Sequence, residues 1–79
     1  MGGLVKRSFS LAGHRTSVAL EPEFWAVLVR VAQCRGQSLA VLVAAVDAAR
    51  GADRPLASAL RVVALLAAQG APATSGGEP

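Results

Sequence analysis

The sequence has few of the residues that build disulfides, metal centres or catalytic sites. It contains one cysteine, one histidine and no tyrosine among 79 residues. One cysteine cannot form an internal disulfide, and one cysteine with one histidine does not make a metal-ligand set. The carboxylates Glu21 and Glu23 flank a predicted helix start rather than a cleft, and no serine, histidine and acid form a convincing nucleophile and base. We therefore predict a protein that is not an enzyme and that carries no metal or other cofactor.

Long apolar runs are also missing, although 53% of the residues are hydrophobic and the mean hydropathy is +0.47. A membrane-spanning helix needs about 20 mainly apolar residues, whereas the longest charge-free apolar stretch, residues 36–46, ends at Asp47. Residues 8–13 are too short and too mixed for a signal-peptide core. We expect a cytoplasmic protein without membrane contact, which buries its excess apolar surface in an obligate oligomer. Cys34 is expected in or beside the core, and a lone buried thiol suits a reducing compartment.

Acidic residues are absent from the first part of the chain. Lys6, Arg7 and Arg15 all precede the first acidic residue, Glu21, and the later charges balance in number. The net charge of +3 therefore resides in the N-terminal segment. A basic segment on a near-neutral body indicates either a polyanion partner at that end or a solubilising tail.

Residues 5–20 alternate between apolar and polar side chains, as β-strands do. Phe9 and Leu11 fall on one side, and Ser8 and Ser10 on the other. After Gly13 the same period gives one face with Thr16, Val18 and Leu20 and an opposite face with Arg15, Ser17 and Ala19. Residues 12–13 are either a turn between two strands or a kink in one extended arm, and both interpretations stay open. We find no internal repeat.

Three helices are predicted after the strand region. Pro22 suits the first turn of a helix over residues 22–35 that stops near Gly36, and Ser38 is a suitable N-cap for a nearly all-apolar helix over residues 39–50. A third helix is expected over residues 55–69, with one apolar face formed by Leu56, Ala59, Leu60, Val63 and Leu66. It either packs on the core or offers this face to a protein partner. Residues 70–79 are expected to be disordered.

Several runs resemble a known family. The run TSVALEP at residues 16–22, with FW at 24–25 and RGQSL at 35–39, resembles the ribbon-helix-helix family of Arc- and MetJ-like repressors. The runs KR at 6–7, AGHRTSV at 12–18 and LEPEFW at 20–25 look like those of a subgroup of small bacterial ribbon-helix-helix proteins. The resemblance covers roughly residues 5–66. It implies a mainly α fold with a short β-ribbon, an intertwined homodimer, and here an additional C-terminal helix.

The resemblance divides the chain into three expected parts. Residues 1–13 are a basic arm, which either stays an arm or adds a strand. Residues 14–69 are a ribbon-helix-helix domain with its third helix, and residues 70–79 are a tail. A single strand cannot satisfy its own backbone groups. It therefore either forms a hairpin with residues 6–11 or pairs with the same strand of a second chain. We expect the dimer core to contain ten residues: Val18, Leu20, Phe24, Trp25, Leu28, Val31, Leu39, Leu42, Val43 and Val46.

The function that the resemblance implies is sequence-preferring binding of double-stranded DNA by a homodimer, or a higher assembly on DNA, that regulates transcription as a repressor. The outer ribbon residues Arg15, Ser17 and Ala19 would contact bases in the major groove. The phosphate contacts would come from Lys6, Arg7, His14, Ser38 and Leu39. Ala19 stands where such repressors often carry a longer polar residue, so modest sequence specificity is expected. The alternative is a protein interaction module, an antitoxin or adaptor, that uses residues 55–69 to hold a partner.

Overall fold

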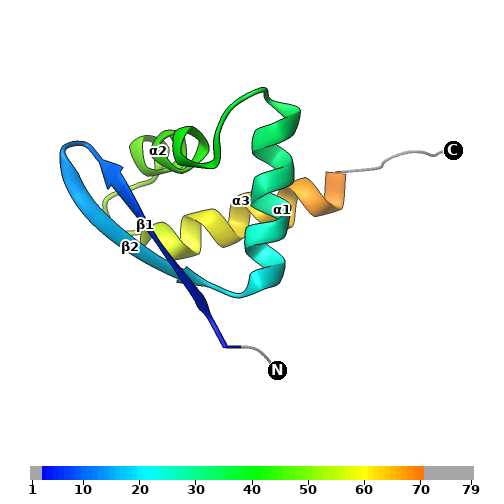
Figure 1. Cartoon of the computed structure of the whole chain (residues 1–79), viewed down its shortest axis with the longest axis horizontal. Helices are drawn as coiled ribbons and strands as arrows, with labels where there is room; N and C mark the ends of the chain where they lie inside the picture. The colour runs from blue at the N-terminus through cyan, green and yellow to red at the C-terminus, as the bar shows by residue number, and fades with distance from the viewer. Residues whose placement is uncertain (1–2, 71–79) are drawn as a thin grey trace, which may run out of the picture.

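A computed structural model describes residues 3–70 of the chain. Two antiparallel strands are followed by three helices (Figure 1). The elements are β1 (Val5–Leu11), β2 (His14–Leu20), α1 (Pro22–Cys34), α2 (Leu39–Ala49) and α3 (Leu56–Gly70). The fold is thus mostly helical with a short β-ribbon, as the sequence predicted. The tail prediction concerns mainly residues 71–79, which lie outside the described part of the chain.

The ribbon is a hairpin formed within one chain. β1 and β2 pair along their whole length, from Val5 opposite Leu20 to Leu11 opposite His14. The connection is a two-residue turn in which both Ala12 (φ 51°) and Gly13 (φ 83°) have positive φ. Such turns match the twist of the flanking strands and close tight hairpins. Of the two interpretations left open for residues 12–13, the structure has the turn, and the strand finds its partner without a second chain.

The helix ends follow from capping and lie within one residue of the predicted limits. The Ser38 hydroxyl accepts a hydrogen bond from the Val41 N–H at 3.1 Å, which caps α2. Gly36 takes φ 67° directly after α1, a conformation that ends helices and suits glycine. α1 and α2 each stop one residue before the predicted end. Arg35 and Arg50, which were predicted as the last helical residues, are the C-caps that follow the two helices. α3 begins after Pro55 and extends to Gly70.

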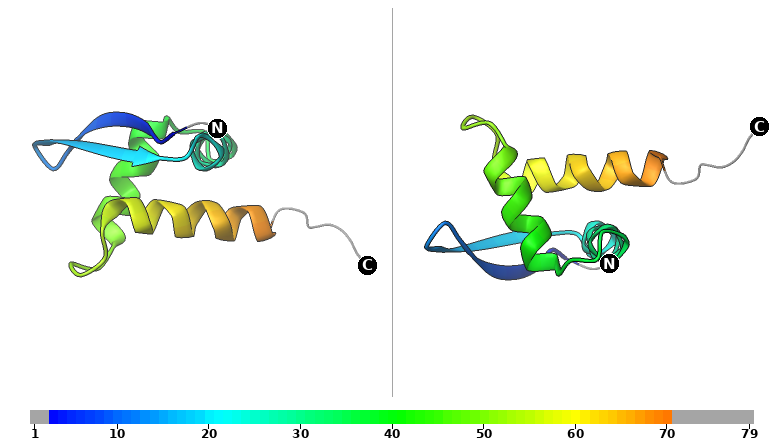
Figure 2. Two further views of the ribbon diagram at one scale, coloured as in Figure 1. Left: turned by 90° about the horizontal axis from the view of Figure 1, so that it is seen from below. Right: turned by 90° about the horizontal axis from the view of Figure 1, so that it is seen from above.

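The core lies where the inner face of the hairpin meets the three helices. α2 contacts β1, α3 contacts β2, and α1 contacts both other helices. In the two views of Figure 2 the hairpin and α3 lie on opposite sides, and α2 spans the space between them. The largest fully buried side chains are Leu20, Leu28, Leu42, Leu60 and Val43. Each strand of the hairpin is therefore supported by a helix of the same chain.

The third helix is part of this core. Leu56, Leu60 and Ala64 of α3 are buried, and Ala59 is 7% exposed. The sequence placed Leu66 on the same face, and this is wrong, because Leu66 is 60% exposed. The orange C-terminal end of α3 projects past α1 in Figure 2, so the last turns of the helix have less of the chain to pack against. Of the two alternatives, α3 packs on the core, and its far end keeps an apolar surface.

The single cysteine is not in the core. Cys34 is exposed at the last position of α1 rather than buried, so the expected place of the lone thiol is wrong. Within residues 3–70 no single helix is long and apolar enough to cross a membrane. α1 and α2 reach the required length and composition only as a pair, which is bent by 98° at their junction.

Candidate nucleic-acid interface

The outward side of the hairpin is a small polar surface. Alternation along the strands buries Phe9, Leu11, Val18 and Leu20 on the inner side. The opposite side carries three cross-strand pairs, which we call the outer ribbon face: Lys6 with Ala19, Ser8 with Ser17, and Ser10 with Arg15. All of these side chains are exposed except Ala19, which is half-buried. The predicted alternation of residues 15–20 is confirmed.

Hydrogen bonds order this face, and its charges are all positive. The Ser8 and Ser17 hydroxyls lie 3.0 Å apart, oxygen to oxygen, across the two strands. The Arg15 guanidinium donates to the Ser10 hydroxyl at 3.4 Å through one nitrogen, Nη1. A guanidinium has five N–H donors, so most of those of Arg15 stay available. Because the face contains Lys6 and Arg15 and no carboxylate, it attracts anions.

Serines on β1 belong to this face, although the sequence interpretation did not assign them a role. Ser8 and Ser10 stand directly opposite Ser17 and Arg15. The alternation had already placed both serines away from Phe9 and Leu11. What the sequence could not supply was the register, which brings them beside the residues of β2.

The two strands present the same order of side chains. From its N-terminal end, each strand places a cation, a serine and a small residue on the outer face and an apolar residue followed by leucine on the inner face. The outer residues are Lys6, Ser8 and Ser10 on β1, and Arg15, Ser17 and Ala19 on β2. The two strands are identical only at the serine of the outer face and the final leucine, so the prediction that the chain has no internal repeat stays a prediction.

Not every predicted phosphate contact lies on the outer ribbon face. Lys6 does, but Arg7 points to the other side, where its guanidinium carbon lies 5.3 Å from the centroid of the Trp25 ring. His14 is exposed at the turn, paired with Leu11 on the inner side of the ladder. Ser38 is exposed and caps α2, and Leu39 is half-buried against the core.

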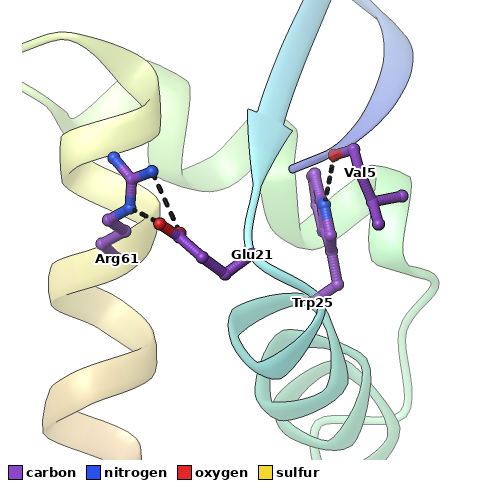
Figure 3. Close-up of polar contacts among 4 residues, drawn as sticks. All are labelled: Val5, Glu21, Trp25 and Arg61. Atoms are coloured by element: carbon purple, nitrogen blue, oxygen red, sulfur yellow. Dashed lines mark hydrogen bonds and ion pairs between the residues drawn. The ribbon is translucent and has the colours of Figure 1, made fainter. Parts of the chain in front are cut away.

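Two polar contacts fix the base of the hairpin to the helices (Figure 3). The Trp25 indole N–H donates to the Val5 carbonyl at 2.8 Å and attaches the start of β1 to α1. Arg61 of α3 donates from Nε and Nη2 to one oxygen of Glu21, at 3.1 and 3.0 Å, directly after β2. A backbone hydrogen bond and the Arg61 guanidinium lower the pKa of Glu21 below its ordinary value of 4.5. The helices thus hold the hairpin at both strands.

The ten residues predicted for a dimer core are packed within this one chain. Six are buried: Val18, Leu20, Trp25, Leu28, Leu42 and Val43. The other four are partly buried against the same cluster: Phe24, Val31, Leu39 and Val46. The role of these residues between two chains stays a prediction. A different set of apolar residues is exposed along one side of α2: Ala40, Val41, Ala44, Ala45, Ala48 and Ala49.

A small β-hairpin carried on three helices, with a cationic outer face, defines a β-ribbon protein. The family model for the ribbon-helix-helix domain matches residues 4–68, so the chain belongs to the ribbon-helix-helix domain family. Members of this family are generally DNA-binding transcription regulators or antitoxins, they typically form dimers, and they are typically not enzymes. No curated protein and no solved structure matches the chain.

Proposed function

We propose that this protein is a sequence-preferring, DNA-binding repressor of transcription that places its outer ribbon face in the major groove. The observation that carries this proposal is the two-stranded ribbon with Lys6 and Arg15 on its outward side and its apolar side buried. The major groove is about 12 Å wide and admits a two-stranded β-ribbon. The phosphates of the two DNA strands that border the groove are negatively charged, so they attract a face whose charges are all positive.

The residues proposed to contact DNA each have a chemistry that suits a part of the duplex. Arg15 is assigned to guanine, whose O6 and N7 accept a bidentate pair of hydrogen bonds. Ser17 offers a hydroxyl that serves as donor or acceptor, and Ala19 offers a methyl contact to thymine. Lys6 is assigned to phosphate. Ser38 and the backbone N–H of Leu39 are assigned to a further phosphate, because a helix N-terminus favours anions.

Arg7 and His14 are proposed as phosphate contacts from the margin of the ribbon, since neither belongs to the outer face. The partner of the chain is proposed to be a second copy, which covers the exposed alanines and Val41 of α2. Val41 is 52% exposed, and contact between two copies would remove this apolar surface from water. We place the protein in the cytoplasm, where a bacterial regulator meets its DNA.

The experiment is a fluorescence-anisotropy titration of labelled duplexes with wild type, Arg15→Ala and Arg30→Ala. Duplexes retained from a random pool by the purified full chain supply the preferred site, and a scrambled duplex is the comparison. Arg30 is exposed on α1, so its substitution removes the same charge away from the ribbon. Arg15→Ala should cost about 1–3 kcal/mol on the preferred site, and Arg30→Ala should change affinity far less.

Salt provides the second readout. Affinity should fall steeply between two salt concentrations, because cations near phosphates release counterions from the DNA. Absence of binding to any duplex at low salt would refute the proposal. Equal effects of the Arg15 and Arg30 substitutions would also refute it. They would mean that Arg15 contributes only its positive charge and makes no specific contact from the ribbon.

The second candidate function is a protein interaction module, and a groove between α2 and α3 favours it. The groove has a volume of about 500 Å³ and an apolar floor that includes Val46, Val62 and Val63. Three arginines are among its lining residues, Arg35, Arg50 and Arg54. The Arg50 guanidinium already donates to Asp47 and to the Arg54 carbonyl. This combination suits an acidic, amphipathic segment of a partner protein. A toxin-like reading frame directly downstream of the gene, whose product co-purifies with this chain, would favour the antitoxin interpretation.

A further inference from the structure

We propose that a groove between the C-terminal parts of α1 and α3 binds a small amphipathic carboxylate, a short fatty acid free in solution. The groove has a volume of about 370 Å³. This lies near the lower end of the range of about 300–1,000 Å³ that small-molecule sites occupy. None of its lining residues belongs to the outer ribbon face. The inference therefore goes beyond DNA binding and does not depend on it.

One face of α1 forms the first wall of the groove. The lining residues on this side are Val27, Arg30, Val31, Cys34 and Arg35. Their spacing of three and four positions places them on one side of a helix. Val27 and Val31 are half-buried, whereas the two arginines and the cysteine are exposed. α1 thus presents an apolar strip that is bordered by two guanidinium groups.

The last turns of α3 form the opposite wall with small side chains. Ala67, which is half-buried, and Ala68, which is exposed, both line the groove. One turn earlier Ala64 is buried, where α3 packs on the core. Methyl groups alone leave space between the two helices beyond that point. A hydrocarbon chain in this space would remove apolar surface of both helices from water.

The charges at the groove have one sign and no partner. Within residues 3–70, Arg30 and Arg35 form no ion pair and donate no side-chain hydrogen bond, whereas Arg50 and Arg61 each pair with a carboxylate. No acidic residue lines the groove. The planar fork of a guanidinium matches the geometry of a carboxylate. The polar end of the ligand is therefore an anion rather than a hydroxyl or an ammonium group.

The ends of the two helices do not cancel this preference. A helix C-terminus carries a partial negative charge of about one half, so α1 and α3 together contribute about one. Arg30 and Arg35 oppose it with two full positive charges. At the end of α1 the backbone N–H groups of residues 35–37 donate to the carbonyls of residues 31–33 at 3.0–3.1 Å. These carbonyls are satisfied, which weakens their repulsion of an anion.

The first arm of the test measures which head group the groove selects. Octanoate, octan-1-ol and octyltrimethylammonium share one chain length, and each is titrated into the full chain while amide signals are followed by NMR. Octanoate should shift the signals of Val31 and Ala67 with a dissociation constant on the order of 1 mM. The alcohol and the cation should bind about tenfold more weakly. Equal affinity for the three compounds, or shifts confined to other parts of the chain, would overturn the inference.

The second arm removes the two charges of the groove. Arg30→Gln with Arg35→Gln should weaken octanoate binding by about tenfold. The matched control is Lys6→Gln with Arg54→Gln, which removes two exposed cations outside this groove and should change the affinity by less than about twofold because salt screens distant charges. Circular dichroism checks that both variants are folded. Equal losses for the two variants would show attraction by net charge alone and would overturn the inference.

The third arm uses the native thiol as a reporter of occupancy. Cys34 lines the groove and is exposed, so the uncharged reagent iodoacetamide should alkylate it in the free protein. Saturating octanoate should slow this reaction severalfold, and octyltrimethylammonium at the same concentration should not. A rate that octanoate leaves unchanged would overturn the inference. So would a rate that falls with rising protein concentration in the absence of octanoate, because a second copy would then occupy the groove.

Discussion

Replacing Leu60 by alanine tests whether α3 belongs to the folded unit. The Leu60 side chain is fully buried. The substitution removes three carbon atoms, which corresponds to roughly 2.4 kcal/mol of lost transfer free energy at about 0.8 kcal/mol each. The cavity left behind adds to this loss, and measured leucine-to-alanine costs in cores are about 2–5 kcal/mol. We expect about 3 kcal/mol, a large share of the stability of a domain this small.

The same substitution at Leu66 is the matched control. Leu66 lies on the same helix but is 60% exposed, so its loss should change the free energy of unfolding by less than about 1 kcal/mol. Urea unfolding followed by circular dichroism gives both values, and Trp25 fluorescence reports on the core independently. Repeating the measurement at two protein concentrations reveals any contribution of Leu66 to self-association. Equal losses for the two variants would refute the placement of α3 in the core.

Three further outcomes follow from single contacts. Trp25→Phe removes the donor to the Val5 carbonyl, and with the lost packing it should lower the free energy of unfolding by about 2 kcal/mol, measured by urea titration. Ala12→Gly relieves a non-glycine residue at φ 51° and should raise that free energy by up to about 1 kcal/mol, visible as a higher Tm. The pKa of Glu21 is lower in the folded state, so the stability from its contact with Arg61 is present above pH 4.5 and is lost as the pH falls through the lowered value. Thermal melts of wild type and Glu21→Gln across this range should converge at low pH, and a constant difference would contradict this account.

The periodic parts of the fold were predictable from the sequence. Alternation assigned Val18 and Leu20 to the core side and Arg15 and Ser17 to the outer side. Pro22 in the first turn and the N-cap Ser38 located the helix starts. These features depend on neighbours along the chain, and a single sequence contains that information. The helix limits were correct within one residue for the same reason.

The register and the long-range contacts were not predictable. The turn at Ala12 was left open because alanine is an uncommon residue at positive φ, and only the paired strands reveal it. The role of Ser8 and Ser10 depends on which residues of β2 stand opposite them. The exposure of Leu66 depends on where the body of the molecule ends beside α3, which periodicity does not encode.

The support of each strand by a helix of the same chain has a consequence for how the ribbon forms. An isolated two-stranded hairpin is marginally stable in water, so this ribbon becomes stable only when α2 and α3 cover its inner face. All of these parts lie within residues 5–70 of one chain, and the loops that close are short. Ribbon formation is then a first-order process, whereas a ribbon shared between two chains must wait for a collision. A newly made molecule can complete its ribbon at any cellular concentration, before it has met a second copy.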